Sequence, residues 1–216
     1  LTPAVMGILN VTPDSFSDGG KYFSTDSAVK RAAEMIEDGA EIIDIGGEST
    51  RPGSLPVPED EEISRIIPVI KEIKALFPGI LISADTKKSK TADEALIAGA
   101  DIINDVSAGD ADEKMYDVIN QHKAVYIIMH MQGTPATMQI NPTYTETVND
   151  IYDYLYLKAE KLKSAGIENL ITDPGIGFGK TVKDNYQILG RIKEFSSIGF
   201  PVLAGLSRKS FLGNSL

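Results

Sequence analysis

The chain has 216 residues, of which 42% are hydrophobic and 24% charged, with a formal net charge of −10 and no cysteine. The acidic balance argues against nucleic acid as the main partner, because a phosphate backbone is bound by a basic face. Without cysteine there are no disulfides or thiolate sites, and no apolar run approaches the roughly 18 residues of a membrane span, so we expect no membrane partner.

Seven short apolar runs alternate with longer amphipathic stretches. We predict strands near Val5–Asn10, Glu41–Gly46, Ile80–Asp85, Ile102–Asp105, Ala124–His130, Leu170–Asp173 and Pro201–Gly205. We predict helices over Asp26–Asp38, Glu59–Phe77, Ser89–Ala98, Glu113–His122, Thr143–Ala165 and Val182–Phe195. Short continuous apolar runs are typical of buried parallel strands, and their alternation with helices predicts an α/β architecture. We see no linker and interpret residues 1–216 as a single domain.

One pattern recurs where a predicted helix passes into the next strand. A glycine follows the helix, a short turn comes next, and the strand then ends in a polar residue; the glycines are Gly39, Gly99 and Gly166. Helices often end on a residue in the left-handed conformation, which glycine adopts without strain. The repeat therefore predicts βα units.

Several predicted strands end on a residue that can take part in chemistry. Asn10, Asp85, Asn104 and Asp173 all stand at such ends. A single residue of this kind is usually a turn or helix cap. In a βα barrel, however, these ends meet at one mouth, where active sites are built. Together they predict a site for a flat polar heterocycle, because carboxylates accept from amino and ring N–H groups and an amide can both donate and accept. We interpret Asp44 as a loop cap and leave it outside the site.

Cations are concentrated in loops on the same expected side of the sheet. Arg51 lies in the long connection after the second strand, and Lys209 follows the seventh. In an acidic protein these positions suggest a small-anion site, although a solvated surface Lys is the commoner case. The glycine-rich turn after Asp173 matches neither the phosphate-loop nor the dinucleotide pattern, but its backbone could approach a ligand closely. His130 is interpreted as a hydrogen-bonded strand-end residue. Mg²⁺ could still bind together with substrate phosphates.

Taken in order, the motifs resemble the dihydropteroate synthase family. The matching segments are Met6–Gly20, Asp44–Gly53, Ser83–Thr86, Ile103–Asp105, Met129–Gly133, Asp173–Lys180 and Ser207–Ser210. The resemblance covers nearly the whole chain, and the combination is far more specific than any one segment. It implies a TIM (β/α)₈ barrel that joins 6-hydroxymethyl-7,8-dihydropterin pyrophosphate to p-aminobenzoate in folate biosynthesis. It also implies release of pyrophosphate along an SN1-like path, Mg²⁺ as cofactor, and sensitivity to sulfonamides.

The resemblance also implies roles for individual residues. The residues expected at the reacting atoms are Asp14, Arg51, Asp85 and Lys209. Those expected around the pterin are Asp85, Asn104, Met129, Asp173, Gly205 and Lys209. Those expected around p-aminobenzoate are Thr50, Arg51, Pro52, Phe178, Lys209 and Ser210. Asn10 is the expected Mg²⁺ ligand.

One departure from the family pattern concerns the end of the chain. A (β/α)₈ barrel typically needs about 250 residues, and no eighth strand or Arg-Val-His motif is recognisable here. We expect strand eight and the last helices to be missing, which would leave two unpaired sheet edges. Two other interpretations stay open: a pterin-binding methyltransferase barrel, and a pterin-binding module without turnover. From the resemblance we further expect a cytoplasmic homodimer.

Overall fold

The fold is built on one parallel sheet. The computed structural model describes residues 3–12, 25–49, 56–134, 137–138, 140–207 and 209. Its strands are β1 (Met6–Asn10), β2 (Ile42–Gly46), β3 (Leu81–Asp85), β4 (Ile102–Asp105), β5 (Val125–Met129) and β6 (Leu170–Asp173). The six strands are neighbours in the sheet in the order in which they occur in the chain. Each parallel pair therefore needs a crossover, and helices provide it.

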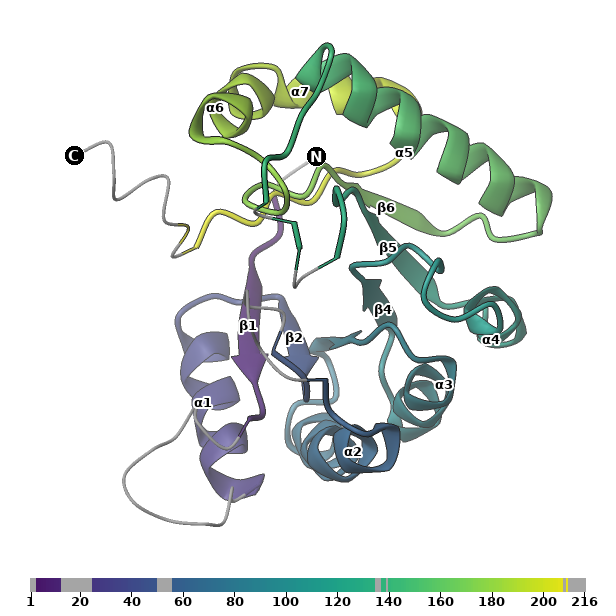
Figure 1. Ribbon diagram of the computed structural model, residues 1–216. Coiled ribbons are helices and arrows are strands. Elements are labelled where there is room, and N and C mark those ends of the chain that lie inside the picture. The colour runs from purple at the N-terminus through teal and green to yellow at the C-terminus, as the bar shows by residue number, and fades with distance from the viewer. Residues whose placement is uncertain are drawn as a thin grey trace.

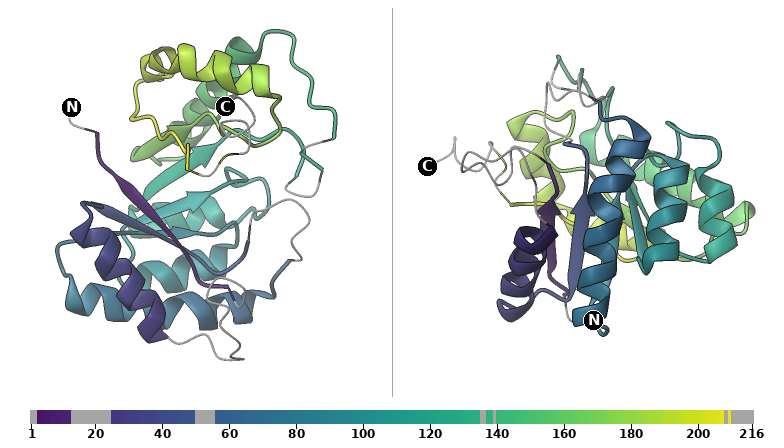
Figure 2. Two further views of the ribbon diagram at one scale, coloured as in Figure 1. Left: turned by 90° about the vertical axis from the view of Figure 1, so that its left-hand side faces the viewer. Right: turned by 90° about the horizontal axis from the view of Figure 1, so that it is seen from below.

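The helices lie on the outer side of the sheet. They are α1 (Thr25–Glu37), α2 (Glu59–Leu76), α3 (Ser89–Ala98), α4 (Met115–His122), α5 (Thr147–Ser164), α6 (Val182–Gly190), α7 (Ile192–Phe195) and the 3₁₀ turn η2 (Ser196–Ile198). The strands follow one another around an arc with the helices outside it (Figure 1), as two further views also show (Figure 2). This is the architecture of a partial TIM barrel, and within the described residues the sheet does not close. No helix in the described ranges is long and apolar enough to cross a membrane.

Two predicted elements differ from the structure. The expected strand Pro201–Gly205 is reduced to one parallel bridge between Thr172 and Val202. Thr172 N–H donates to the Pro201 carbonyl at 2.9 Å, and Leu203 N–H donates to the Thr172 carbonyl at 2.9 Å. The segment thus runs parallel to β6, but it is bonded on one side only and too briefly to form a full strand.

The predicted helix Val182–Phe195 is the second difference, because it divides into α6, α7 and η2. The division falls at Gly190 and Arg191. Glycine weakens a helix interior because it has the most backbone freedom to lose on folding.

The recurrent joints between helix and strand have the geometry that their glycines predict. Gly39, Gly99 and Gly166 have φ values of 102°, 112° and 89°. The residue after each glycine donates its N–H to a carbonyl five residues earlier, at 2.9 to 3.0 Å. This bond satisfies a carbonyl that the helix end would otherwise leave without a partner. The end of α4 makes the same turn with Lys123, whose φ is 52°, so the sequence pattern missed a fourth joint.

The core lies between the sheet and the helices. The core includes Ile43 and Ile45 of β2, Ile82 of β3, and Ile66 and Ile70 of α2, all of which are fully buried between the sheet and the helices. Burying each such side chain contributes about 1.5–3 kcal/mol. Because side chains alternate along a strand, the intervening residues point to the inner face of the arc. The outer face therefore fixes the fold, and the inner face is free to carry polar groups.

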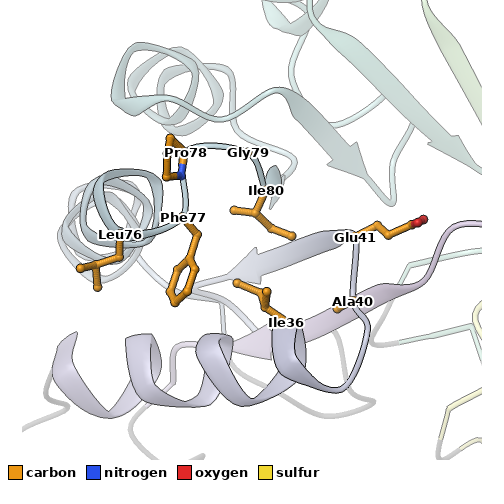
Figure 3. Close-up of a pocket in the computed structure, with 8 residues that line it drawn as sticks. All are labelled: Ile36, Ala40, Glu41, Leu76, Phe77, Pro78, Gly79 and Ile80. Atoms are coloured by element: carbon orange, nitrogen blue, oxygen red, sulfur yellow. The ribbon is translucent and has the colours of Figure 1, made fainter.

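An apolar hollow lies at the amino-terminal rim of the sheet. It has a volume of about 550 Å³ and is lined by Ile36, Ala40, Glu41, Leu76, Phe77, Pro78, Gly79 and Ile80. These residues come from the ends of α1 and α2 and from the segments leading into β2 and β3 (Figure 3). Active sites of βα barrels lie at the opposite rim, where the strands end. The hollow is therefore not the candidate active site.

The Gly39 joint yields a test of the backbone argument. A Cβ at Gly39 would meet nothing within 4 Å, so alanine there adds only the strain of its left-handed backbone. We expect Gly39→Ala to lower the free energy of unfolding by about 1–2 kcal/mol. Lys123→Gly relieves the same left-handed strain but gives the unfolded chain more freedom, so it should leave the free energy of unfolding unchanged or raise it by up to about 1 kcal/mol. Urea unfolding of both variants measures the difference, and equal losses would contradict the argument.

Candidate active site

The register of the sheet gathers the strand-end polar residues on one side. Asn10 pairs with Gly46, Gly46 with Asp85, and Asp85 with Asn104, so these residues form one row across β1 to β4. Residues in one row of a parallel sheet point to the same face. Asn10 is exposed, whereas Asp85 and Asn104 are half-buried. The sequence prediction that these three residues meet at one rim agrees with this arrangement.

Asp173 and Met129 extend this rim on the other side of β4. They are register partners at the ends of β6 and β5, and both are buried. The Gly175 N–H donates to Asp173 Oδ1 at 2.7 Å. Burial raises the pKa of Asp173 to about 6, while that hydrogen bond and the charges of Lys180 and Lys209 oppose the rise. The carboxyl group therefore changes protonation state near pH 6 and is mostly ionised at neutral pH.

Asp44 lies one layer below the row, and its interpretation as a loop cap is wrong. Its side chain is only 5% exposed, and Asn104 Nδ2 donates to Asp44 Oδ2 at 3.1 Å. Asp44 pairs in register with Ser83, two residues before Asp85, so it faces the same side. Asp44 therefore belongs to the site. The sequence did contain a signal for this. Asp44 stands two residues before the end of a predicted strand, and because side chains alternate along a strand it points to the same face as the strand-end residues.

The two inner carboxyl groups disfavour each other's charge. Burial raises the pKa of Asp44 to about 6, while the neighbouring Ser83 side chain and the hydrogen bond from Asn104 oppose the rise. The pKa of Asp85 is raised well above its usual value, first by burial and then by the charge of Asp44. Two nearby carboxyls that both lose water favour a state in which one keeps its proton. The floor of the site can thus accept a hydrogen bond at one carboxyl and donate one at the other.

A cation and an aromatic ring form one wall of the site. Lys209 Nζ lies 4.1 Å from the centre of the Phe178 ring. Burial lowers the pKa of Lys209, while the charge of Asp173 opposes this. A Cβ on Gly177 would lie 2.8 Å from Lys209 Cδ, and Gly177 has a φ of 83°, so only glycine lets the lysine approach the turn. Gly205 is half-buried, and a Cβ there would meet nothing within 4 Å, so no neighbour demands glycine at this position.

Several expected site residues fall outside the described part of the chain. They are Asp14, Thr50, Arg51, Pro52 and Ser210. Both described flanks of residues 50–55 are held by one half-buried ion network. Lys88 Nζ donates to Glu48 Oε2 at 2.6 Å, to the Val57 carbonyl at 2.8 Å, and to Glu62, which is 1% exposed. Lys87 Nζ adds a bond of 2.8 Å to Glu48 Oε1. The network ties Glu48 and Val57 to the start of α3, beside Asp85.

Sequence reasoning also missed Lys180. It included this residue only as the end of the matching segment Asp173–Lys180, yet Lys180 is 4% exposed and its charge acts on Asp173. Lys180 Nζ hydrogen-bonds to both the ring and the carbonyl of His130. The interpretation of His130 as a hydrogen-bonded strand-end residue is therefore confirmed.

This arrangement agrees with comparisons to known proteins. The family model described as pterin binding enzyme matches residues 6–216. The dihydropteroate synthase of Haemophilus influenzae is 49% identical over 213 residues, which are 98% of this chain and 77% of the relative. The solved Yersinia pestis dihydropteroate synthase with a sulfonamide drug complex has a TM-score of 0.92 and 42% identity, over 99% of this chain and 78% of that one. The Xanthomonas albilineans dihydropteroate synthase solved with 4-aminobenzoic acid has a TM-score of 0.91 and 41% identity, over 99% and 76%.

The chain has an inner rim of acids and amides at the strand ends of a partial barrel, and that family model matches nearly its whole length. It therefore belongs to the pterin-binding enzymes. Within them it belongs to the dihydropteroate synthases, which are transferases of folate synthesis.

The raised pKa of Asp44 predicts a stability change with a definite sign. Because its pKa is higher in the folded than in the unfolded chain, the wild type loses stability as pH rises from about 4 to about 6 and does not regain it above. Asp44→Asn removes this penalty and should be more stable than the wild type at pH 8 by about 2–3 kcal/mol. The difference should shrink towards pH 4.

Asp105→Asn is the matched contrast. Burial raises the pKa of Asp105 as it does that of Asp44, but Asp105 accepts hydrogen bonds from Ser107 N–H and Oγ, Gly109 N–H and Tyr126 Oη, at 2.6 to 2.8 Å, and these oppose the rise. An amide cannot accept all four, so this variant should lose about 1–3 kcal/mol. Denaturant titrations at pH 4 and pH 8 measure both effects. A gain in Asp105→Asn, or a loss in Asp44→Asn at pH 8, would refute the distinction.

Proposed function

We propose that this chain condenses 6-hydroxymethyl-7,8-dihydropterin pyrophosphate with p-aminobenzoate and releases pyrophosphate. The observation that carries the proposal is the common inner rim of Asp85, Asn104 and Asp173, with Lys209 and Phe178 beside Asp173. These groups offer acceptors, a donor amide and a cation around one space. A flat heterocycle with an amino group, ring N–H groups and a carbonyl is their chemical complement.

The pterin would lie on the three strand-end side chains. Asp173 would accept from an exocyclic amino group and the adjacent ring N–H. The Asn104 amide, whose Nδ2 already donates one bond to Asp44, would offer its oxygen and its second N–H. Asp85 would contact the other ring, and Lys209 would donate to the pterin carbonyl. Met129 and Gly205 would complete the pocket, as the family resemblance implies.

The second substrate would bind beside Lys209. The Phe178 ring offers an apolar face, and the lysine in contact with it supplies positive charge for a carboxylate. The Xanthomonas albilineans relative solved with 4-aminobenzoic acid shows that an enzyme of this fold takes that compound. Thr50, Arg51, Pro52 and Ser210 would complete this subsite, as the resemblance implies.

The reaction exchanges one bond for another. The bond between the pterin methylene carbon and the pyrophosphate oxygen breaks, the amine nitrogen forms a bond to that carbon, and the amine releases a proton. In the SN1-like order the carbon–oxygen bond breaks first. Carboxylates against the pterin would stabilise the electron-poor carbon, and Lys209 would hold the second substrate through its carboxylate with the amine directed at that carbon. Asp14 and Arg51 would act at the reacting atoms and exclude water, which would otherwise trap the carbon.

The residues present are compatible with Mg²⁺. Asn10 offers an exposed amide oxygen, a hard ligand of the kind that Mg²⁺ prefers. Next to it in the row, Gly46 has no side chain, and a Cβ there would already touch Asp85 Oδ2 at 3.3 Å. The described residues hold no cluster of three or more acidic or histidine ligands, which suits an ion bound largely through substrate phosphates and water. When bound, Mg²⁺ would neutralise charge on the departing pyrophosphate.

Three further properties belong to the proposal. We interpret the chain as one domain, acting as a homodimer in the cytoplasm, because the family resemblance implies all three. The identity of 49% with the Haemophilus influenzae enzyme supports carrying them over.

The activity is tested by incubating the protein with both substrates and Mg²⁺ and measuring pyrophosphate. We expect release that depends on p-aminobenzoate. Asp85→Ala should reduce kcat/KM by about 100-fold or more and move the melting temperature by no more than about 4 °C. Gly39→Ala, which is remote from the rim, serves as a control that changes stability with little effect on kcat/KM.

The two rival interpretations predict other outcomes. A methyltransferase barrel would bind methyltetrahydrofolate and ignore the pyrophosphate substrate. A module without turnover would bind the pterin, as calorimetry would show, and form no product. Either result would replace the proposal.

Metal removal provides an independent test. EDTA should abolish pyrophosphate release, and excess Mg²⁺ should restore it, because the departing charge has to be neutralised. Asn10→Ala should raise the Mg²⁺ concentration needed for half-maximal activity by about 10-fold, since the remaining ligands are phosphate and water. Full activity in EDTA would contradict a role for the metal.

A further inference from the structure

Lys180 is a buried lysine whose three hydrogen-bond partners are all uncharged. Its Nζ lies 3.1 Å from His130 Nδ1, 3.1 Å from the His130 carbonyl and 2.8 Å from the Phe178 carbonyl. An ammonium has three N–H donors, so the set is complete. Lysine is rarely this buried unless it is paired with a charge, and an apolar residue of similar size would avoid the loss of hydration. The lysine therefore calls for an explanation beyond packing.

The three acceptors join two separate turns of the rim. His130 directly follows β5, and Phe178 lies in the turn that follows β6. The turns are already in close contact: a Cβ on Gly175 would lie 1.9 Å from the His130 carbonyl oxygen, and one on Gly179 would lie 2.7 Å from the Gln132 carbonyl oxygen. Carbonyl dipoles that converge in this way repel one another unless a donor lies between them. Lys180 is that donor.

The histidine is held in the state that this role requires. Burial, and then the charge of Lys180, lower the pKa of His130 to about 3. The ring is therefore neutral, and Nδ1 can accept from Lys180 while the proton stays on Nε2. Tyr154 packs edge-on against the imidazole at 5.0 Å, and Tyr144 contacts it at 5.9 Å. Tyr144 Oη also donates to the Gly179 carbonyl at 2.6 Å. The ring that packs against His130 is therefore itself bonded to the turn that carries Phe178.

Lys180 thereby fixes the backbone of Phe178 from one side. On the other side, Phe178 N–H donates to the Gly175 carbonyl at 3.0 Å. With its carbonyl and its N–H both bonded, the backbone of Phe178 is held, and this sets the direction in which its side chain leaves the turn. That ring is the one in contact with Lys209.

We propose that Lys180, with His130 as its partner, is a positioning residue that sets the Phe178–Lys209 wall of the p-aminobenzoate subsite. This inference rests on the proposed function for the identity of the substrate. The effect of Lys180 on the turn that carries Phe178 is independent of that function. Lys180 touches neither the substrate nor the reacting atoms in this proposal. Its effect should therefore fall more on p-aminobenzoate than on the pterin. The pterin residues Asp85 and Asn104 stand on other strands, and only Asp173 and Lys209 connect the pterin to Lys180.

The first test is a kinetic comparison of Lys180→Met with the wild type. Methionine keeps the length and removes all three donors. We expect the KM for p-aminobenzoate to rise about 10-fold or more. The KM for the pterin substrate should rise only about 3-fold or less, through Asp173, on which the charge of Lys180 acts, and Lys209, which serves both substrates. Lys74→Met is the matched control. Lys74 Nζ is likewise bonded to a carbonyl, that of Ile80, and to Asp101 at the opposite rim, so both KM values should stay unchanged. Equal changes in both KM values of Lys180→Met, or no change, would overturn the proposal.

A second pair of variants decides the question if Lys180→Met does not fold. His130→Asn keeps an acceptor near the position of Nδ1, whereas His130→Leu removes it, and both lose the imidazole packing. We expect the KM for p-aminobenzoate to be at least about 5-fold higher in the leucine variant than in the asparagine variant. Equal values would refute the proposed partner role.

Amide exchange separates this inference from the proposed function. In the wild type, a lack of pyrophosphate release would refute the function. Hydrogen exchange at the Phe178 amide needs no substrate, and in the two His130 variants it should be about 10-fold faster with leucine than with asparagine. The Ala100 amide, bonded to the Ala95 carbonyl at 2.9 Å on the far side of the sheet, is the internal reference. Unchanged exchange at Phe178 would show that the turn does not depend on this contact.

Discussion

The in-register parallel pairing of the strands is the constraint on which the site depends. Asn10, Gly46, Asp85 and Asn104 occupy successive strands, and only the ladder brings them into one row. A slip of one residue in any strand would turn its polar end towards the helices and its apolar residues towards the site. The isoleucines on the outer face oppose such a slip, because they are fully buried. The packing of the core thus fixes the orientation of the chemistry.

The inner face carries groups that destabilise the folded chain. Asp44, Asp85 and Asp173 lose water on folding, and burial raises the pKa of each. A protein selected only for stability would place apolar residues there, as it does on the outer face. Buried acids with shifted pKa values are typical of functional sites. They are also prepared to bind a polar ring without first giving up a hydration shell, which lowers the reorganisation needed when the ligand enters.

The turns after the strands are organised by a different kind of contact. Behind β2, charges pair with charges, as Glu48 and Glu62 do with Lys88. Behind β5 and β6, backbone carbonyls converge on the ammonium of Lys180. Both arrangements use a lysine, Lys88 half-buried and Lys180 buried, to hold irregular backbone that has no ladder of its own, and this gives polar groups away from water their partners. Loops that carry binding residues are thus positioned by the scaffold rather than by their own sequence preferences.

The sequence by itself determined six of the seven predicted strands and most of the helix ends, because these depend on local patterns: apolar runs, and glycines such as Gly39 where the chain must turn left-handed. It also identified Asp85, Asn104 and Asp173, since strand ends can be read locally. Only the tertiary structure decided the roles of Asp44 and Lys180. Their partners, Asn104 and His130, lie 60 and 50 residues away, and contacts across such separations leave no periodicity in the chain. Whether an Asp is a cap or part of a site, and whether a Lys is solvated or buried, is set by neighbours that the fold brings to it.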